Sequence, residues 1–480
     1  MLFNSFEFML FLPIAFLLYW LVFRERRFQN LLIVVASYLF YGWWDWRFLC
    51  LISFTSLCSY GSGLLIELYE GKRNCQKYLC VTNIVLNLSI LAIFKYYNFF
   101  VENLDALLGL VGYHLDWVTM NIILPVGISF YTFQALSYTI DIYQKKLPAT
   151  HDIVEFFAYI SFFPQLVAGP IERATNLLPQ FQKDRQFDYE KAVDGCRQML
   201  WGFFKKLVIA DNCASAVNSH WNSYADLPGF SIFFLGVLFS FQIYCDFSGY
   251  SDIAIGCARL FGLNLKRNFD YPYFSRSIPE FWRRWHISLM TWFRDYIYIP
   301  LGGSRGNHWK TIRNILIVFF ISGLWHGANW TFICWGMWHA CLIVFFLVLG
   351  INTKTRNNVT QRKYFPSVKE FFQISTTFLL VVFGWMLFRA NGIEEFYNII
   401  HSIVVNQPFV YGSIYGKTVF LHVLLMVIID WIQRDKQHSL QFPNNVIFSH
   451  RFNRWLVYII LYLYIISCTG QSQTFLYFQF

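Results

Sequence analysis

The sequence predicts an all-α integral membrane protein with roughly 11–13 transmembrane, re-entrant and interfacial helices. Two observations support this fold class: an apolar composition, and charge-free stretches long enough to cross a bilayer. Hydrophobic residues make up 56% of the 480 residues, charged residues only 14%, and the mean hydropathy is +0.41. A soluble domain carries about 25% charge. The composition therefore excludes a soluble enzyme, a disordered scaffold and a secreted disulfide-stapled domain.

Charge-free stretches mark the expected spans, because a helix needs about 20 apolar residues to cross a bilayer. The first is expected to be a retained span, since no basic residue precedes its apolar part and no small-residue cleavage site follows. A stretch near 203–217 is a weaker candidate, and the broken composition of 156–171, with two prolines, favours a re-entrant element. The expected segments are 8–23, 28–44, 48–66, 78–94, 117–140, 156–171, 227–245, 314–353, 371–388, 418–429 and 456–480.

Basic residues alternate between the early loops. Residues 24–27 include three arginines, 98–116 contain acids without Lys or Arg, and 145–146 are two lysines. Because basic loops stay in the cytoplasm, we expect the N-terminus outside the cell. The net charge of +10 is then explained by these loops and by contact with anionic membrane lipids, and no nucleic acid partner is expected.

Cysteines and enzyme motifs carry little information here. The eleven cysteines form no C-x-x-C pair, and buried cysteine usually behaves as a small apolar residue. We expect no disulfide framework and no metal site. The sequence contains no Walker A, G-x-S-x-G or H-E-x-x-H motif, so neither an elbow serine hydrolase nor a zinc protease is indicated.

The stretch 314–353 holds forty residues without a charge and is flanked by basic residues, which predicts two helices that enter and return. His326 falls in its middle, where a helix break at Gly323 or Gly327 would place the imidazole at membrane depth. An ionisable group there indicates a functional site, and desolvation favours the neutral form that can act as a general base. The alternative is a structural histidine, which we favour for His339 on the same stretch.

Residues 259–313 hold ten basic residues and three acids, together with many aromatics, which predicts a cytoplasmic interface region with amphipathic helices. Within it, Arg283 and Arg284 precede His286. Two arginines beside aromatic rings could hold a phosphorylated carrier, or could equally contact lipid headgroups. Asp295 could orient a histidine or pair with an arginine, and we expect the pairing.

The segment QIYCDFSGYSD at 242–252 places polar groups in an apolar stretch without nearby Lys or Arg. Its members include Asp246 and Ser248. Polar groups at membrane depth usually face a cavity or a partner. They could line a substrate passage, or they could form a hydrogen-bonded packing network.

Several segments are similar to the motifs of one membrane enzyme family. They read MLFNSFEFMLFLPIAFLLYW at the start, LPVGISFYTFQALSYTIDIY at 124–143, FFPQLVAGPIER at 162–173, CDFSGYSDIAIG at 245–256, FWRRWHISLMTWFRDYIYIPLGG at 281–303, GLWHGANWTFICWGMWHA at 323–340 and YFQF at 477–480. On these motifs the chain resembles the membrane-bound O-acyltransferases (MBOAT) of the alginate O-acetylation type, nearly from end to end.

The resemblance implies a ring of tilted helices around a funnel or tunnel. It implies that His326 is the catalytic residue and that His286 is a second family histidine on the cytoplasmic side. It also implies acetyl-CoA or another acyl thioester as the donor, with no bound cofactor. An extracytoplasmic acetyltransferase partner of the SGNH type, a polysaccharide acceptor and a location in the bacterial inner membrane are implied as well.

We therefore expect one polytopic domain over 1–480, with N-terminal spans in 1–150, a catalytic core in 151–350 and C-terminal spans in 351–480. The expected function is acetyl transfer across the membrane for O-acetylation of a cell-surface polysaccharide such as alginate. Alternatives are acyl transfer to a teichoic acid, lipid or protein, or a non-enzymatic glycan or anion transporter, although no inverted repeat is seen. Besides the two histidines, the expected substrate contacts are Arg283, Arg284, Asn329, Trp325, Asp246 and Ser248.

Overall fold

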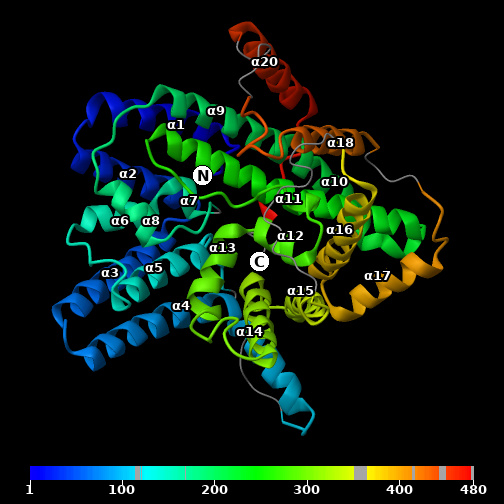
Figure 1. The fold of residues 1–480 in the computed structure, drawn as a ribbon, viewed down its shortest axis with the longest axis horizontal. Coiled ribbons are helices and arrows are strands. Elements are labelled where there is room, and N and C mark those ends of the chain that lie inside the picture. Colours follow the sequence, from blue (N-terminus) through cyan, green and yellow to red (C-terminus); the bar gives the residue numbers. More distant parts are fainter. Residues whose placement is uncertain are drawn as a thin grey trace. The chain divides into compact units, whose positions relative to one another are not determined.

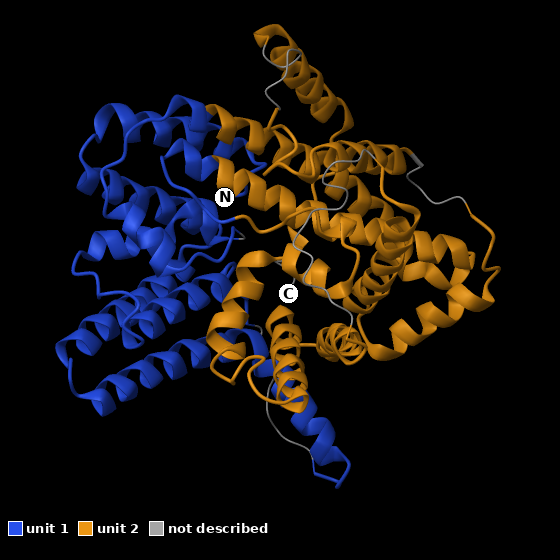
Figure 2. Ribbon diagram, viewed as in Figure 1, with its two compact units in different colours: residues 1–192, 257–266 blue, residues 193–256, 267–480 orange. Residues whose placement is uncertain are grey.

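A computed structural model describes residues 1–113, 119, 122–167, 169–350, 365–412, 417–442 and 450–476. These residues contain helices and no strand, which confirms the all-α fold class (Figure 1). They form two compact units, one of residues 1–192 and 257–266 and the other of residues 193–256 and 267–480 (Figure 2). The closing YFQF motif and the first residues of the expected 117–140 span lie outside the described residues.

Unit 1 holds the N-terminal helices. An aromatic cluster forms part of its core: the ring centroids of Phe3 and Phe8 lie 4.8 Å apart, and those of Phe11 and Phe163 lie 5.2 Å apart. The expected re-entrant element is broken, because Phe162 (φ −47°, ψ 106°) separates two short helices. The helices are α1 (Phe6–Leu17), η1 (Leu18–Val22), α2 (Arg26–Gly42), α3 (Arg47–Leu68), α4 (Arg73–Gly109), α5 (Ile128–Tyr143), α6 (Ile153–Ser161), α7 (Phe163–Leu166), α8 (Ala174–Phe181) and the first residues of α9 (Tyr189–Phe203).

Unit 2 holds the remaining helices, apart from the last residues of α11, which belong to unit 1. Both histidines of interest lie in unit 2. Its helices are η2 (Phe204–Ala210), α10 (Asp211–His220), η3 (Trp221–Asp226), α11 (Gly229–Leu260), η4 (Pro272–Phe274), α12 (Ile278–Arg284), α13 (Ile287–Phe293), η5 (Arg294–Tyr298), α14 (His308–His326), α15 (Trp330–Val348), α16 (Val368–Arg389), α17 (Ile393–Val405), α18 (Lys417–Ile432) and α20 (Arg451–Cys468).

Several expected spans have wrong boundaries. Helix α4 (Arg73–Gly109) extends far beyond the expected 78–94, and two later spans differ as well. The span at 227–245 is too short, because α11 continues to Leu260 through the polar CDFSGYSD segment. The span at 456–480 is too long, because α20 ends at Cys468 and residues 469–475 are not helical. Hydropathy marked only the apolar first part of α11, and the expected last span joined the apolar residues of α20 to the polar residues 469–474 that follow them.

Within the part of the chain that the structure describes, five helices are long and apolar enough to cross a membrane, namely α3, α4, α11, α15 and α16. The helical segments 6–22 and 418–432 are shorter apolar candidates. Large apolar side chains are exposed along α20, where Phe452 is 76% and Leu463 56% exposed. Such exposure suits contact with lipid, because the bilayer accepts apolar side chains while helices satisfy their own backbone groups.

Helices α14 and α15 form a closely packed hairpin, as expected for the charge-free stretch at 314–353. The predicted break is at Gly327, which is extended (φ −175°, ψ 162°) and follows the last residue of α14. Gly323 and Gly336 let the helices approach closely. A Cβ on Gly323 would clash with the backbone oxygen of Phe332, and one on Gly336 with that of Phe319.

Gly336→Ala is expected to destabilise the protein by about 1–3 kcal/mol, because an added methyl group in a packed contact with backbone cannot be relieved by side-chain movement. The measurement is the thermal unfolding midpoint of the detergent-solubilised chain. The matched control is Gly61→Ala, at a helical glycine with no atom within 4 Å of an added Cβ. Equal midpoints for the two variants would contradict the close approach of α14 and α15.

Candidate active site

His326 ends α14, directly before the extended Gly327, and its side chain is buried, with the residue only 3% exposed. Aromatic rings surround the imidazole edge to face. The ring centroids of Trp335 on α15 and Phe388 on α16 lie 5.0 Å and 5.5 Å from it. Three helices therefore place a histidine in an enclosed aromatic environment, where a polar ring interacts strongly with any bound polar group because water is largely excluded.

The loop that carries Asn329 closes the same hairpin. Its side-chain oxygen accepts a hydrogen bond from the Thr331 N–H (3.0 Å), and its amide nitrogen donates to the Asn391 oxygen (2.9 Å). Asn329 is thus the N-cap of α15, a position that Asn favours because it satisfies an orphan N–H. The structure shows this capping role, and the substrate contact expected of Asn329 from the sequence stays a prediction.

His286 lies at the corner between α12 and α13, 1% exposed and in the left-handed region (φ 45°, ψ 51°). Burial lowers the pKa of His286 to about 3, so the imidazole is neutral at physiological pH. The strained corner is held by its neighbours on both sides. The Asp270 N–H donates to the Arg284 oxygen, and the Ile287 N–H donates to the Asn268 oxygen, each at 2.9 Å.

Left-handed backbone is costly for a residue other than Gly, Asn or Asp, at about 1–3 kcal/mol. His286→Val is therefore expected to lower the yield of folded protein, whereas His286→Asn retains it, because Asn tolerates this conformation and a β-branched residue does not. Size-exclusion profiles of the solubilised variants measure the yield. Equal yields would contradict the strained corner, and the activity of the Asn variant reports the chemical role of the imidazole separately from folding.

Trp325 packs against both histidines. Its ring centroid lies 5.9 Å from that of His286 and 4.9 Å from that of His326. Trp325 is one of the substrate contacts expected from the sequence, and the structure brings its ring into contact with both imidazoles. His339 instead packs among Phe281, Trp282 and Trp335 and is fully buried.

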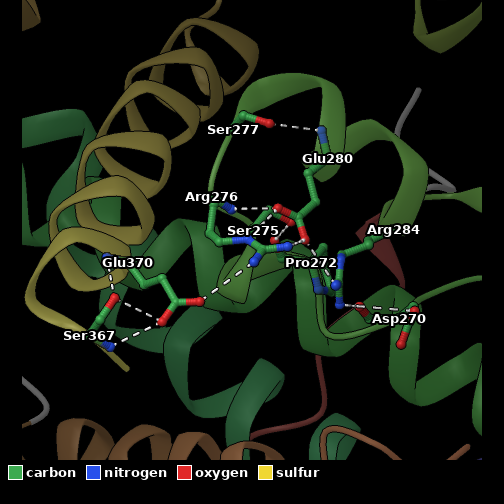
Figure 3. Close-up of polar contacts among 9 residues, drawn as sticks. All are labelled: Asp270, Pro272, Ser275, Arg276, Ser277, Glu280, Arg284, Ser367 and Glu370. Atoms are coloured by element: carbon green, nitrogen blue, oxygen red, sulfur yellow. Dashed lines mark hydrogen bonds and ion pairs between the residues drawn. The ribbon is translucent and has the colours of Figure 1, made fainter. Parts of the chain in front are cut away.

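The structure separates the two arginines of the RRWH segment. Arg284 is buried and pairs with Glu280 (2.9 Å), whereas Arg283 is exposed. Figure 3 shows the network around Glu280, which also pairs with Arg276 (3.1 Å). Arg276 reaches Glu370 (3.5 Å), whose carboxylate and Ser367 form the capping box at the start of α16 (Figure 3). The network connects α12, which leads into His286, with the helix that carries Phe388.

The interface region 259–313 differs from its expected form, because its aromatic side chains between Phe281 and Phe293 are buried within unit 2. The short helices α12 and α13 therefore contribute to the core around His286. The expected pairing of Asp295 is confirmed, since Arg294 contacts it at 2.6 Å.

Two lysines that were not predicted as site residues lie next to the CDFSGYSD segment. Lys206 pairs with Asp246 (2.7 Å), and Lys205 pairs with Asp252 and donates to the Ser248 hydroxyl (3.0 Å). The segment has no Lys or Arg near it in the sequence, but folding brings these two lysines to its carboxylates. The α9–η2 segment approaches α11 through glycines, since a Cβ on Gly202 would lie 2.6 Å from the Gly249 oxygen. The signal in the sequence that could have found the two lysines is their place inside the weaker apolar stretch 203–217, because a charged group at membrane depth needs a partner.

An apolar cavity of about 190 Å³ lies beside the His286 corner, between α11, η4, α16 and α18. Tyr244 and Tyr273 line the cavity and also contact Trp285, the residue before His286. Among the residues that the structure describes, no group of three His, Cys, Asp or Glu side chains is placed to hold a metal ion. The site therefore consists of two buried histidines, an aromatic shell and flanking ion-pair networks.

Residues 38–389 match the model of the membrane-bound O-acyltransferase family, MBOAT. The chain belongs to this family. It is 41% identical to the probable alginate O-acetylase AlgI of Pseudomonas aeruginosa over 82% of this chain and 73% of that protein. It is 41% identical to the probable alginate O-acetylase AlgI of Azotobacter vinelandii over 82% of this chain and 76% of that protein. It is 30% identical to the peptidoglycan O-acetyltransferase of Helicobacter pylori over 98% of this chain and 95% of that protein.

The MBOAT assignment confirms the resemblance noted from the motifs, and it makes the chain a multi-pass membrane O-acyltransferase. The matched region contains both histidines, all of α14 and α15, and the Glu280 network. The roles of the individual residues in acyl transfer stay predictions.

Proposed function

We propose that this MBOAT enzyme transfers an acetyl group from a cytoplasmic thioester, acetyl-CoA, toward hydroxyl groups of a cell-surface polysaccharide of the alginate type. The observation that carries the proposal is the placement of His326, a buried imidazole at the break between two packed helices. The names of the relatives support an acetyl group and a glycan acceptor. The surrounding aromatic rings support a dry site in which a neutral base keeps its proton-accepting form.

In the proposed step, His326 accepts the proton of the acceptor hydroxyl while that oxygen attacks the thioester carbonyl. A carbon–oxygen bond forms, the carbon–sulfur bond breaks, and the imidazolium returns the proton to the leaving thiolate. General base catalysis supplies a factor of about 10²–10⁴. Positioning of donor and acceptor must supply much of the remaining acceleration, because it replaces a bimolecular encounter by a reaction between held groups.

We propose further that the donor reaches the site from the cytoplasm and that an extracytoplasmic SGNH-type acetyltransferase receives the acetyl group. This arrangement places the chain in a bacterial inner membrane with its N-terminus outside. It is supported by the distribution of basic loops, since the positive residues of short loops set the orientation of membrane spans.

A second acceptor deserves a direct test, because the peptidoglycan O-acetyltransferase of Helicobacter pylori matches the chain almost from end to end. The experiment expresses the chain with its partner genes and measures base-labile acetyl esters separately in exopolysaccharide and in peptidoglycan. Acetyl esters in exopolysaccharide support the proposal. Acetyl esters in peptidoglycan alone would mean that the acceptor is peptidoglycan instead. Normal membrane levels of protein without acetyl esters in either fraction would refute it, and altered glycan export without esters would favour a transporter.

A further inference from the structure

The segment that follows α20 runs along the surface as far as Thr474 and enters the core of unit 2 with its last two described residues. Residues 469–475 are not helical, yet Phe475 and Leu476 are only 2% and 3% exposed. One backbone and one side-chain hydrogen bond tie the start of the segment to η2 and α10. The Gly470 N–H donates to the Leu207 oxygen (3.0 Å), and the Asn212 amide donates to the Cys468 oxygen (2.9 Å).

A buried charge cluster holds the far end of this segment. Lys206 lies between Asp211 (2.9 Å) and Asp246 (2.7 Å), and the three side chains are at most 6% exposed. Lys206 also donates to the Gln473 oxygen (3.3 Å), and the Leu476 N–H donates to the second carboxylate oxygen of Asp246 (2.7 Å). One cation faces two carboxylates, so the buried carboxylates need further hydrogen-bond donors besides Lys206. The segment supplies one of them through its backbone.

Aromatic contacts continue from the segment toward the candidate active site. The ring centroid of Phe475 lies 4.8 Å from that of Tyr250 and 6.2 Å from that of Phe247, both on α11. The Phe247 ring lies in turn 4.7 Å from the imidazole of His286, edge to face. A single aromatic ring therefore separates the segment from the histidine.

We propose that residues 469–476 are a positioning element of the acyltransferase site, held in place by the Lys206 cluster and acting on His286 through Phe475 and Phe247. The proposal rests on the proposed function, because its effect is measured as acyl transfer. Packed interiors transmit displacements, and a misplacement of about 1 Å far from the chemistry can cost about 10²-fold in rate. Release of the segment should thus slow the reaction without removing any group that touches the substrate.

The experiment compares Lys206→Met with the conservative Lys206→Arg in the full chain. Membranes supplied with acetyl-CoA and acceptor give kcat and the KM for the donor, and amide hydrogen exchange of the purified chain reports the seating of residues 469–476. For Lys206→Met we expect faster exchange in this segment, a kcat lowered about 10-fold to 100-fold and a nearly unchanged KM. Lys206→Arg is expected to show the hydrogen exchange and the kcat of the unmodified chain.

The positioning role would be wrong if hydrogen exchange in residues 469–476 became faster while kcat stayed unchanged. It would also be wrong if kcat fell while these residues stayed fully protected from exchange. If Lys206→Met does not fold, Phe475→Ala decides the question against Phe452→Ala, which removes the same ring from an exposed position on α20. Equal kcat values for these two variants would overturn the proposal. Absence of transfer by the unmodified chain would instead refute the proposed function, whereas the exchange measurement still reports the seating of the segment.

Discussion

His326→Ala is expected to lower the rate of acetyl transfer about 10²–10⁴-fold, because it removes the proposed general base while the surrounding helices remain. The measurement is acetyl ester content of surface polysaccharide per unit of folded protein in the membrane. His326→Gln should show the same loss with better packing, since the amide fills most of the space between Trp335 and Phe388 but cannot accept a proton at neutral pH.

The control for this variant is His339→Ala on the same hairpin. His339 is fully buried among aromatic rings, so its removal should reduce the amount of folded protein. The transfer rate per folded molecule should stay near that of the unmodified enzyme. If His326→Ala retained acetylation at normal protein levels, the assignment of His326 as the base would be wrong.

Glu280→Ala is expected to destabilise the protein by about 3–5 kcal/mol, because it leaves Arg276 and Arg284 largely buried without their shared carboxylate. The side chain of Glu280 is 6% exposed, so solvent cannot replace it. The unfolding midpoint of the solubilised protein measures the effect. Activity should fall as well, since the network supports the corner that carries His286.

A comparison with the exposed ion pair in η5 tests whether burial decides how strongly Glu280→Ala destabilises the protein. Asp295→Ala removes the partner of Arg294, whose side chain is 57% exposed. Exposed ion pairs contribute about 0–1 kcal/mol, so this variant should unfold near the midpoint of the unmodified protein. Similar losses for Glu280→Ala and Asp295→Ala would contradict the role given to the buried network in Figure 3.

Local signals in the sequence were enough for several features of the candidate site. A charge-free stretch of forty residues with a glycine near its centre predicted the α14–α15 hairpin, and the break is at Gly327. Two prolines and a glycine predicted the broken element that became α6 and α7. Such features depend on the length, hydropathy and backbone preferences of neighbouring residues, which a sequence displays directly.

The surroundings of Asp246 could not be derived in the same way. Its cation, Lys206, stands forty residues earlier, and its backbone donor at Leu476 stands 230 residues later. The expected span at 456–480 was too long for a different reason, because it ran through the polar residues 469–474 that follow the end of α20 at Cys468.

By itself, then, the sequence determined that the chain is a helical membrane protein, that its motifs resemble those of membrane-bound O-acyltransferases, and that His326 stands at a helix break. Tertiary structure alone decided that Trp325 packs against both histidines, that Arg284 is paired while Arg283 is exposed, and that residues 469–476 reach the ring beside His286. The physical reason is the range of each interaction. Helix formation and hydropathy act between near neighbours in the chain, whereas buried charges and close-packed rings require partners that only folding brings together.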